Sequence, residues 1–220
     1  MTTVVLLRHG RTSANATGVL AGRTPGVDLD AQGRRQARSL GTRLRTIPLD
    51  AVVHSPLERC VQTADGVLAD RPDVARHADD RLIECDYGDW TGRALAELAT
   101  EPLWPVIQEA PSTVTFPGGE SMVAMAQRAT AAVSELVARH PDGVVAVVSH
   151  GDVIKAILSD ALGQPLDAFQ RIVVGPGSLS VVRYQADRAG RAVVLRMNDT
   201  GRSLPVHPAT GRPTVGGGTG

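Results

Sequence analysis

Short apolar runs recur along the chain between longer amphipathic segments. The first run covers residues 3–7 and stops at Arg8-His9-Gly10, a pattern that predicts a buried strand opening into a loop. Residues 51–54 and 144–148 predict two more short buried strands. Residues 179–182 and 192–197 predict two late strands, which could pair antiparallel.

The amphipathic segments predict helices. After a loop at residues 11–30 that is rich in glycine, proline, asparagine and aspartate, a helix carries Leu40 and Leu44 on its apolar face and is expected to end at Pro48. The strongest helical pattern covers residues 121–139. Its apolar stripe consists of Met122, Met125, Ala126, Ala129, Val133, Leu136 and Val137.

Two further helices are predicted directly after strands. One runs towards Leu68, with Ser55 as its expected N-cap and Pro56 as its first helical residue. The other is opened by the residues at 149–152. Each of these helices begins where a strand has just ended, so the polar residues at its start are expected near the sheet.

The rest of the chain carries weaker patterns. Residues 70–120 look irregular, with one short helix near 93–99 and a turn-rich loop at 111–120. From about Val206 the sequence consists largely of proline, glycine and threonine and has no means of building a core. We therefore expect one domain over residues 1–205 and a flexible C-terminal tail over residues 206–220.

Strands that alternate with helices predict an α/β fold, a three-layer sandwich with a mainly parallel central sheet flanked by helices. In such folds, ligands bind beyond the carboxyl ends of the strands. Polar residues follow three of the predicted strands directly, at Arg8-His9, at 54–59 and at 149–150. The pattern therefore predicts that two histidines and two arginines meet at one edge of the sheet.

Charge and composition narrow the function classes. The 220 residues include 23 basic and 23 acidic side chains, so no net field favours nucleic acid or an anionic membrane. No apolar run reaches the roughly 20 residues of a membrane helix, and no signal peptide is recognisable. The two cysteines have no disulfide spacing, which indicates a reduced, cytoplasmic protein. No cluster of histidines, cysteines or carboxylates has metal spacing, so no metal is expected.

The polar residues after the strands suit phosphoryl transfer. Arginine holds a phosphate dianion, a neutral imidazole can attack phosphorus, and a carboxylic acid can protonate the leaving oxygen. The segment Arg8-His9-Gly10-Arg11-Thr12-Ser13-Ala14-Asn15 has the form RHGxTxxN. Five further motifs follow in order, at 30–37, 55–64, 82–92, 117–121 and 149–151.

Together these motifs resemble the histidine phosphatase superfamily, also called the phosphoglycerate mutase-like family, over roughly residues 3 to 200. The resemblance implies that His9 is the nucleophile and that Glu84 donates the proton to the leaving group and later activates water. It also implies that Arg8, Arg59 and His150 hold the phosphoryl oxygens. Two further substrate contacts are expected, Asn15 as an additional donor and Arg23, and Arg11 is expected to add positive charge at the pocket mouth.

The function implied is hydrolysis of a small phosphorylated substrate by a histidine (acid) phosphatase that needs no cofactor. Two alternatives remain, a phosphoglycerate mutase and a non-catalytic phosphate-binding relative. The second is disfavoured because both His9 and Glu84 are present. The first is disfavoured by the GxWxG form of residues 88–92, which looks like the phosphatase branch.

Other phosphatase and hydrolase classes do not fit the sequence. Neither cysteine is followed by an arginine six residues on, which excludes the cysteine phosphatase motif, and the G-x-S-x-G motif of serine hydrolases is absent. Nothing in residues 93–117, which are expected to cover the pocket, specifies the substrate. The sequence leaves open whether the protein forms a homodimer.

Overall fold

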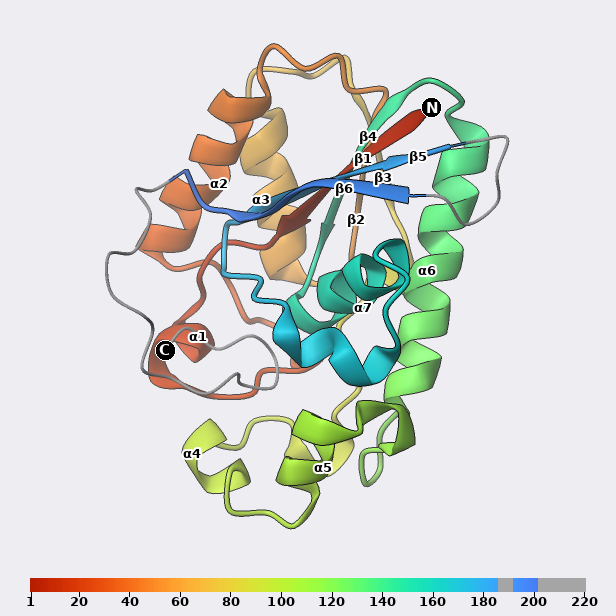
Figure 1. Ribbon diagram of the computed structural model, residues 1–220. Helices are drawn as coiled ribbons and strands as arrows, with labels where there is room; N and C mark the ends of the chain where they lie inside the picture. The colour runs from red at the N-terminus through yellow and green to blue at the C-terminus, as the bar shows by residue number, and fades with distance from the viewer. Residues whose placement is uncertain (186–191, 202–220) are drawn as a thin grey trace.

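A six-stranded sheet runs through the centre of the molecule in the order β3-β2-β4-β1-β5-β6 (Figure 1). The computed structural model describes residues 1–185 and 192–201, so the tail expected at 206–220 lies outside the described residues. The strands are β1 (Thr2–Arg8), β2 (Ala51–His54), β3 (Ala75–Ala78), β4 (Val144–Ser149), β5 (Leu179–Tyr184) and β6 (Ala192–Asp199).

The sheet is parallel on one side and antiparallel on the other. β1 pairs in parallel with β4, and β2 pairs in parallel with both β4 and β3. β5 runs antiparallel to β1 and β6 antiparallel to β5. The α/β fold with a mainly parallel sheet is confirmed, as is the antiparallel pairing of the two late strands.

Helices cover both faces of the sheet (Figure 1). α2 (Ala31–Leu44) and α3 (Glu58–Leu68) pack on one face, where Leu40 and Val67 join a core with Val5 and Val148. α6 (Met122–Arg139) and α7 (Gly151–Ala161) pack on the other, in a larger core. α1 (Ser13–Thr17), α4 (Leu95–Leu98) and α5 (Leu103–Glu109) lie beyond the carboxyl ends of the parallel strands.

Two predicted helix ends were wrong. Ser55 is not the N-cap of α3, because Leu57 is the cap and Glu58 the first helical residue. The Ser55 amide still continues the strand pairing by donating to the Val148 carbonyl, and the chain bends at Pro56 and Leu57 before the helix begins. α2 ends at Leu44, before the expected Pro48.

Residues 70–120 hold more regular structure than predicted. The short helix expected near 93–99 is present as α4, but α5 and the edge strand β3 were not predicted. β3 reads Ala-Arg-His-Ala and carries no buried side chain, so it lacks the alternation that identifies a strand. Within the described residues, no helix is long and apolar enough to cross a membrane.

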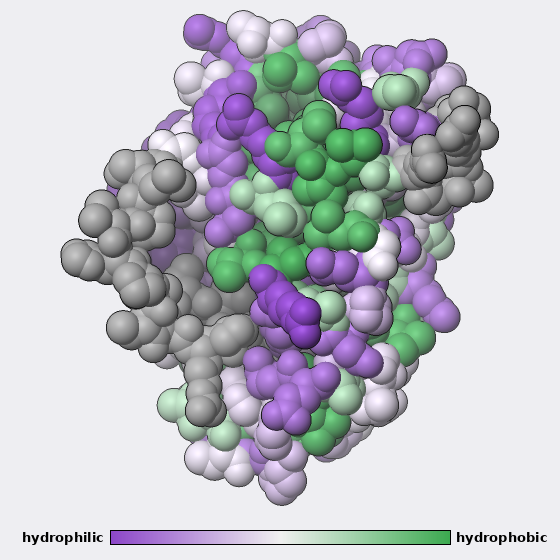
Figure 2. All heavy atoms as spheres, viewed as in Figure 1, coloured by the Kyte–Doolittle hydropathy of each residue, from purple (hydrophilic) through white to green (hydrophobic). Residues whose placement is uncertain are grey.

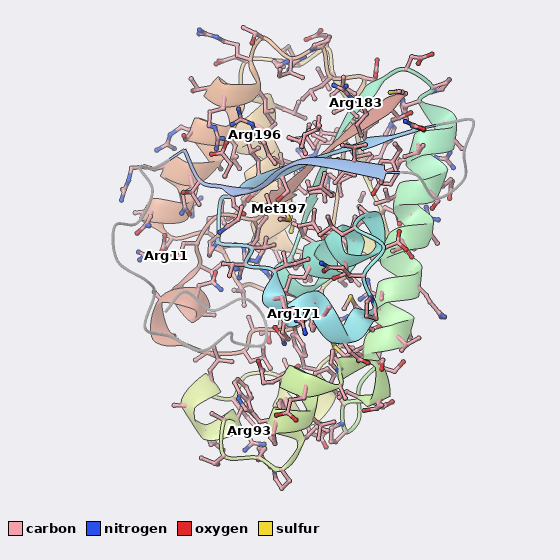
Figure 3. All side chains as sticks on the ribbon, in the orientation of Figure 1. Arg11, Arg93, Arg171, Arg183, Arg196 and Met197 are labelled. Atoms are coloured by element: carbon pink, nitrogen blue, oxygen red, sulfur yellow. The ribbon has the colours of Figure 1, made fainter. Side chains whose placement is uncertain are left out.

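The other edge of the sheet exposes apolar side chains. Val193, Leu195 and Met197 alternate along β6 and are each about half exposed, at 49%, 47% and 47%. Figure 2 shows a hydrophobic patch over this part of the molecule, and Figure 3 labels Met197 within it. Among the described residues, the core between α2, α3 and the sheet includes side chains of β1, β2, β4 and β5 but none of β6.

Candidate active site

The end of β1 and the helix that follows β2 meet at one pocket, as the sequence predicted, whereas His150, which follows β4, is not among the residues that line it. Its lining includes Arg8, His9, Asn15, Arg59, Glu84 and Tyr87. The register explains the meeting, because Arg8 is opposite Ser149 in the ladder and the His9 amide donates to the Ser149 carbonyl. His150 therefore lies beside His9, with ring centroids 5.2 Å apart.

His9 is a buried imidazole with a defined tautomer. Its Nδ1 lies 2.8 Å from the Gly10 carbonyl, and because a carbonyl only accepts, Nδ1 carries the proton. The lone pair is then on Nε2. Burial, together with the charges of Arg59 and Arg8, holds the pKa of His9 well below its usual value. The ring is therefore neutral near pH 7 and has a nucleophilic nitrogen.

Two buried arginines supply positive charge. Arg8 donates from Nη1 to the Val174 carbonyl at 2.6 Å, and Arg59 donates from Nη2 to the Gly22 carbonyl at 2.6 Å. These bonds leave Arg59 Nη1 buried without a hydrogen-bond partner among the described residues. A buried guanidinium N–H lacks a partner only at a cost, so an anion in the pocket would satisfy it.

His150 is completely buried beside the nucleophile. Its Nε2 lies 2.8 Å from Ser55 Oγ and 3.5 Å from Cys60 Sγ. Burial and the charge of Arg59 hold the pKa of His150 well below its usual value, so it is also neutral. Ser55 Oγ also accepts from the amide of Leu57, the residue that precedes α3, at 3.4 Å.

Glu84 brings a carboxyl group into the same pocket. Its side chain is 5% exposed, and Oε1 accepts from the Cys85 amide at 3.0 Å. Burial, with the negative charge of Asp152 as the next cause, raises the pKa of Glu84 to about 7. A carboxyl group with that pKa is largely protonated just below neutral pH, as a proton donor must be.

The main chain of Glu84 is held by two arginines. Arg23 Nε donates to the Glu84 carbonyl at 2.9 Å and Arg128 Nη2 at 3.1 Å, while Glu120 binds both guanidinium groups. Arg23 also pairs with Asp86. Arg23 therefore binds the loop that carries Glu84, and it is not among the residues that line the pocket. Its role as a substrate contact stays a prediction.

Asn15 lines the pocket and also caps a helix. Its Oδ1 accepts from the Thr12 amide and hydroxyl at the start of α1. The amide nitrogen is the atom of Asn15 that could donate to a phosphoryl oxygen. Arg11, by contrast, lies beside α2 (Figure 3) and pairs with Asp30 at 2.7 Å, outside the pocket lining, so the charge expected at the mouth is absent there.

Close backbone contacts fix the loop that carries His9. A Cβ on Gly10 would lie 2.5 Å from the Gly33 carbonyl oxygen, and a Cβ on Gly33 would lie 2.0 Å from the Arg11 carbonyl oxygen. Thr63 accepts from the Gly10 amide, and Gln36 accepts from the Arg11 amide. The motifs at 30–37 and 55–64 therefore hold the nucleophile loop against α2 and α3.

Some functional candidates were missed in the sequence. Tyr87 lines the pocket, and its hydroxyl donates to Asp152 at 2.9 Å. Asp152 and Lys155 are both buried in α7, where the periodicity predicted only inward apolar residues. Their (i, i+3) spacing is the signal in the sequence that could have identified a charged pair.

Comparisons with known proteins extend over nearly the whole chain. The model of the histidine phosphatase superfamily (branch 1) matches residues 4–200. A phosphoserine phosphatase from Hydrogenobacter thermophilus is 31% identical, with 91% of this chain and 93% of the relative covered. A probable phosphoglycerate mutase from Proteus mirabilis is 35% identical, with 84% and 86% covered.

A solved structure shares the fold as well. The mycobacterial glucosyl-3-phosphoglycerate phosphatase in complex with VO3 has a TM-score of 0.80 and 29% identity, covering 90% of this chain and 98% of that one. The resemblance read from the motifs is thereby confirmed. This chain belongs to the histidine phosphatase superfamily.

Proposed function

We propose that this protein hydrolyses small phosphomonoesters through a phosphohistidine on His9, with Glu84 as the proton donor. The observation that carries the proposal is the neutral imidazole of His9, which shares one buried pocket with two guanidinium groups and a carboxyl group whose pKa is near 7. The similarity to phosphatases of known substrate supports hydrolysis as the reaction.

In the first step, Arg8 and Arg59 bind the phosphoryl oxygens, with His150 and Asn15 as additional donors. His9 Nε2 attacks phosphorus, the ester P–O bond breaks, and the leaving oxygen takes the proton of Glu84. In the second step, water attacks the phosphohistidine and gives its proton to the Glu84 carboxylate. The N–P bond breaks, its electron pair returns to Nε2, and inorganic phosphate leaves.

The direction of the His9 shift and the pKa of about 7 for Glu84 support a working range on the acid side of neutrality, which is the finer proposal of a histidine acid phosphatase. His9 stays neutral because its pKa is held well below the usual value. Glu84 donates a proton only while protonated, and its pKa is about 7. We therefore expect kcat/KM for an ester with a poor leaving group to fall as the pH rises above about 7.

Trapping of the intermediate tests the proposal. Brief exposure of the full chain to a 32P-labelled substrate should place an acid-labile, base-stable phosphoryl group on His9. His9→Ala should lose at least 10²-fold in kcat, roughly the contribution of a nucleophile. A His9→Ala variant that keeps a tenth of the wild-type kcat would overturn the mechanism.

The setting of the enzyme remains part of the proposal. We propose that residues 1–205 form one catalytic domain that works in the cytoplasm on small phosphorylated molecules, without a metal or cofactor and without binding nucleic acid or a membrane. Dialysis against EDTA should leave kcat unchanged. A loss that Zn²⁺ or Mg²⁺ restores would contradict the metal-free mechanism.

Mutase activity is the second candidate, because one relative is a probable phosphoglycerate mutase at 35% identity. The first half-reaction would be the same in both enzymes. They differ in whether the phosphoryl group on His9 is transferred to water or to a second acceptor.

A further inference from the structure

A group of charged and polar side chains is buried behind the pocket, in the first turns of α7. Asp152 is completely buried and Lys155 is 2% exposed. Asp152 accepts a hydrogen bond from the Tyr87 hydroxyl at 2.9 Å and pairs with Lys155 Nζ at 3.5 Å. The catalytic steps described above use neither residue.

Further contacts hold Asp152 and Lys155 in place. Lys155 Nζ donates to Gln170 Oε1 at 2.9 Å and lies 5.2 Å from the centre of the Phe169 ring. Burying an ion pair costs desolvation energy on both sides, and an apolar pair of similar volume would often be at least as stable. Stability alone is therefore a weak reason for a charged pair at this position.

The position of Asp152 relative to Glu84 gives a better reason. The groups that act on the Glu84 carboxyl come from several elements: Arg8 at the end of β1, Arg59 on α3, Asp152 on α7 and the Cys85 amide in its own loop. The two guanidinium groups and the amide all favour the carboxylate. Burial of the carboxyl group is the largest effect that opposes them, and the negative charge of Asp152 adds to it. Tyr87, which binds Asp152, lines the same pocket as Glu84.

We propose that Asp152, held by Tyr87 and Lys155 behind the pocket, is a positioning residue for Glu84, the proton donor of the proposed mechanism. Arg8 and Arg59 favour loss of the Glu84 proton before substrate arrives, and without Asp152 only burial of the carboxyl group would remain among these effects to oppose them. Asp152 offsets their effect on Glu84 and leaves both guanidinium groups in the pocket. This inference rests on the proposed role of Glu84 as the proton donor.

The test compares pH profiles of kcat/KM for Asp152→Asn and the wild type. Asparagine keeps the size and can still accept from Tyr87, so the substitution removes mainly the charge. With phenyl phosphate, the basic limb should move to lower pH by roughly one unit, which lowers kcat/KM about fivefold at pH 7. With 4-nitrophenyl phosphate, whose leaving group needs less protonation, kcat/KM at pH 7 should change by less than about twofold.

Asp160→Asn is the matched control, because Asp160 is an exposed aspartate of the same helix. Its pH profile should coincide with that of the wild type. If Asp152→Asn instead lowers kcat/KM by the same factor at every pH and for both esters, Asp152 has a merely structural role and the inference is wrong.

A second variant covers the case in which Asp152→Asn does not fold. Lys155→Met keeps Asp152 and Tyr87 and removes the cation, so the basic limb should move to higher pH. If the basic limb of the pH profile stays at the same pH or moves to lower pH, the inference is wrong. Glu84→Gln distinguishes failure of the proposed function from failure of this inference. If kcat/KM falls equally for both esters in Glu84→Gln, Glu84 is not the acid and the proposed function fails. If kcat/KM falls more for phenyl phosphate in Glu84→Gln but the pH profile of Asp152→Asn does not shift, only the role of Asp152 is refuted.

Discussion

Glu84 is placed through its main chain as well as its side chain. Arg23 and Arg128 bind its carbonyl, and Glu120 ties those two guanidinium groups together. These contacts fix the loop, while burial and the charge of Asp152 raise the pKa of the carboxyl group itself. The same arrangement explains why Arg23 is engaged outside the pocket.

Removal of this acid should depend on the leaving group. Glu84→Gln keeps the shape of the side chain and removes its proton, so kcat/KM for phenyl phosphate should fall by roughly 10²-fold or more. For 4-nitrophenyl phosphate, the loss should be smaller. Steady-state rates for a series of aryl phosphates should show that kcat/KM of the variant depends more steeply on the pKa of the leaving group than kcat/KM of the wild type. If the slope does not change, proton donation belongs to another group, with Asp86 and Asp89 the next candidates.

Arg59 should matter more to the transition state than to the bound ester. Its Nη1 is buried without a partner in the described part of the chain, and charge builds up on the phosphoryl oxygens as they transfer. Arg59→Ala should lower kcat/KM by about 10²–10³-fold and weaken competitive inhibition by vanadate by a comparable factor. Arg38→Ala, which removes an exposed arginine of α2, is the control and should change neither. Unaltered vanadate inhibition in Arg59→Ala would place the anion elsewhere.

At the residue level, the sequence predicted those site residues that lie within the motifs. His9, Arg59 and Glu84 line one pocket, as expected, and His150 lies behind His9. Asp152 was missed because helical periodicity assigns each position a side of the helix and says nothing about the charges that face it from other elements. Only the fold brings Asp152 close enough to act on Glu84.

At the level of elements, α2 is the support on which the nucleophile loop rests. Gly33 contacts the backbone at Arg11, and Gly41, two turns later in the same helix, contacts the Gly66 carbonyl of α3. Neither position has room for a methyl group. The two glycines therefore offer a matched pair, one next to the catalytic loop and one distant from it.

Gly33→Ala should reduce both activity and stability, whereas Gly41→Ala should reduce stability alone. Each methyl group would meet main-chain atoms, at 2.0 Å and 2.6 Å respectively, so a cost of about 1–3 kcal/mol in the free energy of unfolding is expected for both. Because the His9 loop would be displaced, kcat of Gly33→Ala should also fall roughly tenfold or more. Urea unfolding and kcat measured on the same samples give both values. Equal kcat in the two variants would show that α2 does not position the loop.

The elements that could be predicted are those with a strong apolar period. β1, β4 and α6 have one, and the structure has them within one or two residues of the expected ends. The start of α3 could not be predicted from the serine. Ser55 Oγ lies 2.8 Å from His150 Nε2, 95 positions away in the chain, and accepts from the Leu57 amide at 3.4 Å, yet the helix begins two residues later than the local capping preference suggests.

At the level of the whole molecule, the cations around the pocket are mostly paired. Arg23 binds Glu120 and Asp86, Arg11 binds Asp30, and Arg93 binds Glu97 and Glu101. Figure 3 places Arg93 near α4, whose Leu95 lines the pocket. Across residues 1–185 and 192–201, the arginines that line the pocket are the two assigned to the phosphoryl group.

This distribution of charge bears on the choice between hydrolysis and mutase activity. A mutase must hold a substrate that carries a carboxylate as well as a phosphoryl group, and it must protect its phosphohistidine from water until the product has reoriented. The surroundings of Glu84 offer Cys85 and Asp86, an apolar thiol and an anion, next to the acid. Neither residue attracts a carboxylate, and the arginines nearest to them are already paired with Glu120.

We therefore predict that inorganic phosphate is released from several small phosphomonoesters without any requirement for a bisphosphoglycerate. NMR can follow 3-phosphoglycerate incubated with the full chain and a catalytic amount of 2,3-bisphosphoglycerate. Free phosphate should form faster than 2-phosphoglycerate, because both arginines that line the pocket within residues 1–185 and 192–201 are assigned to the phosphoryl group, which leaves no cation among these residues for the substrate carboxylate. Faster accumulation of 2-phosphoglycerate would refute hydrolysis as the main reaction. It would leave the nucleophilic role of His9 intact, since both reactions begin with the same transfer to Nε2.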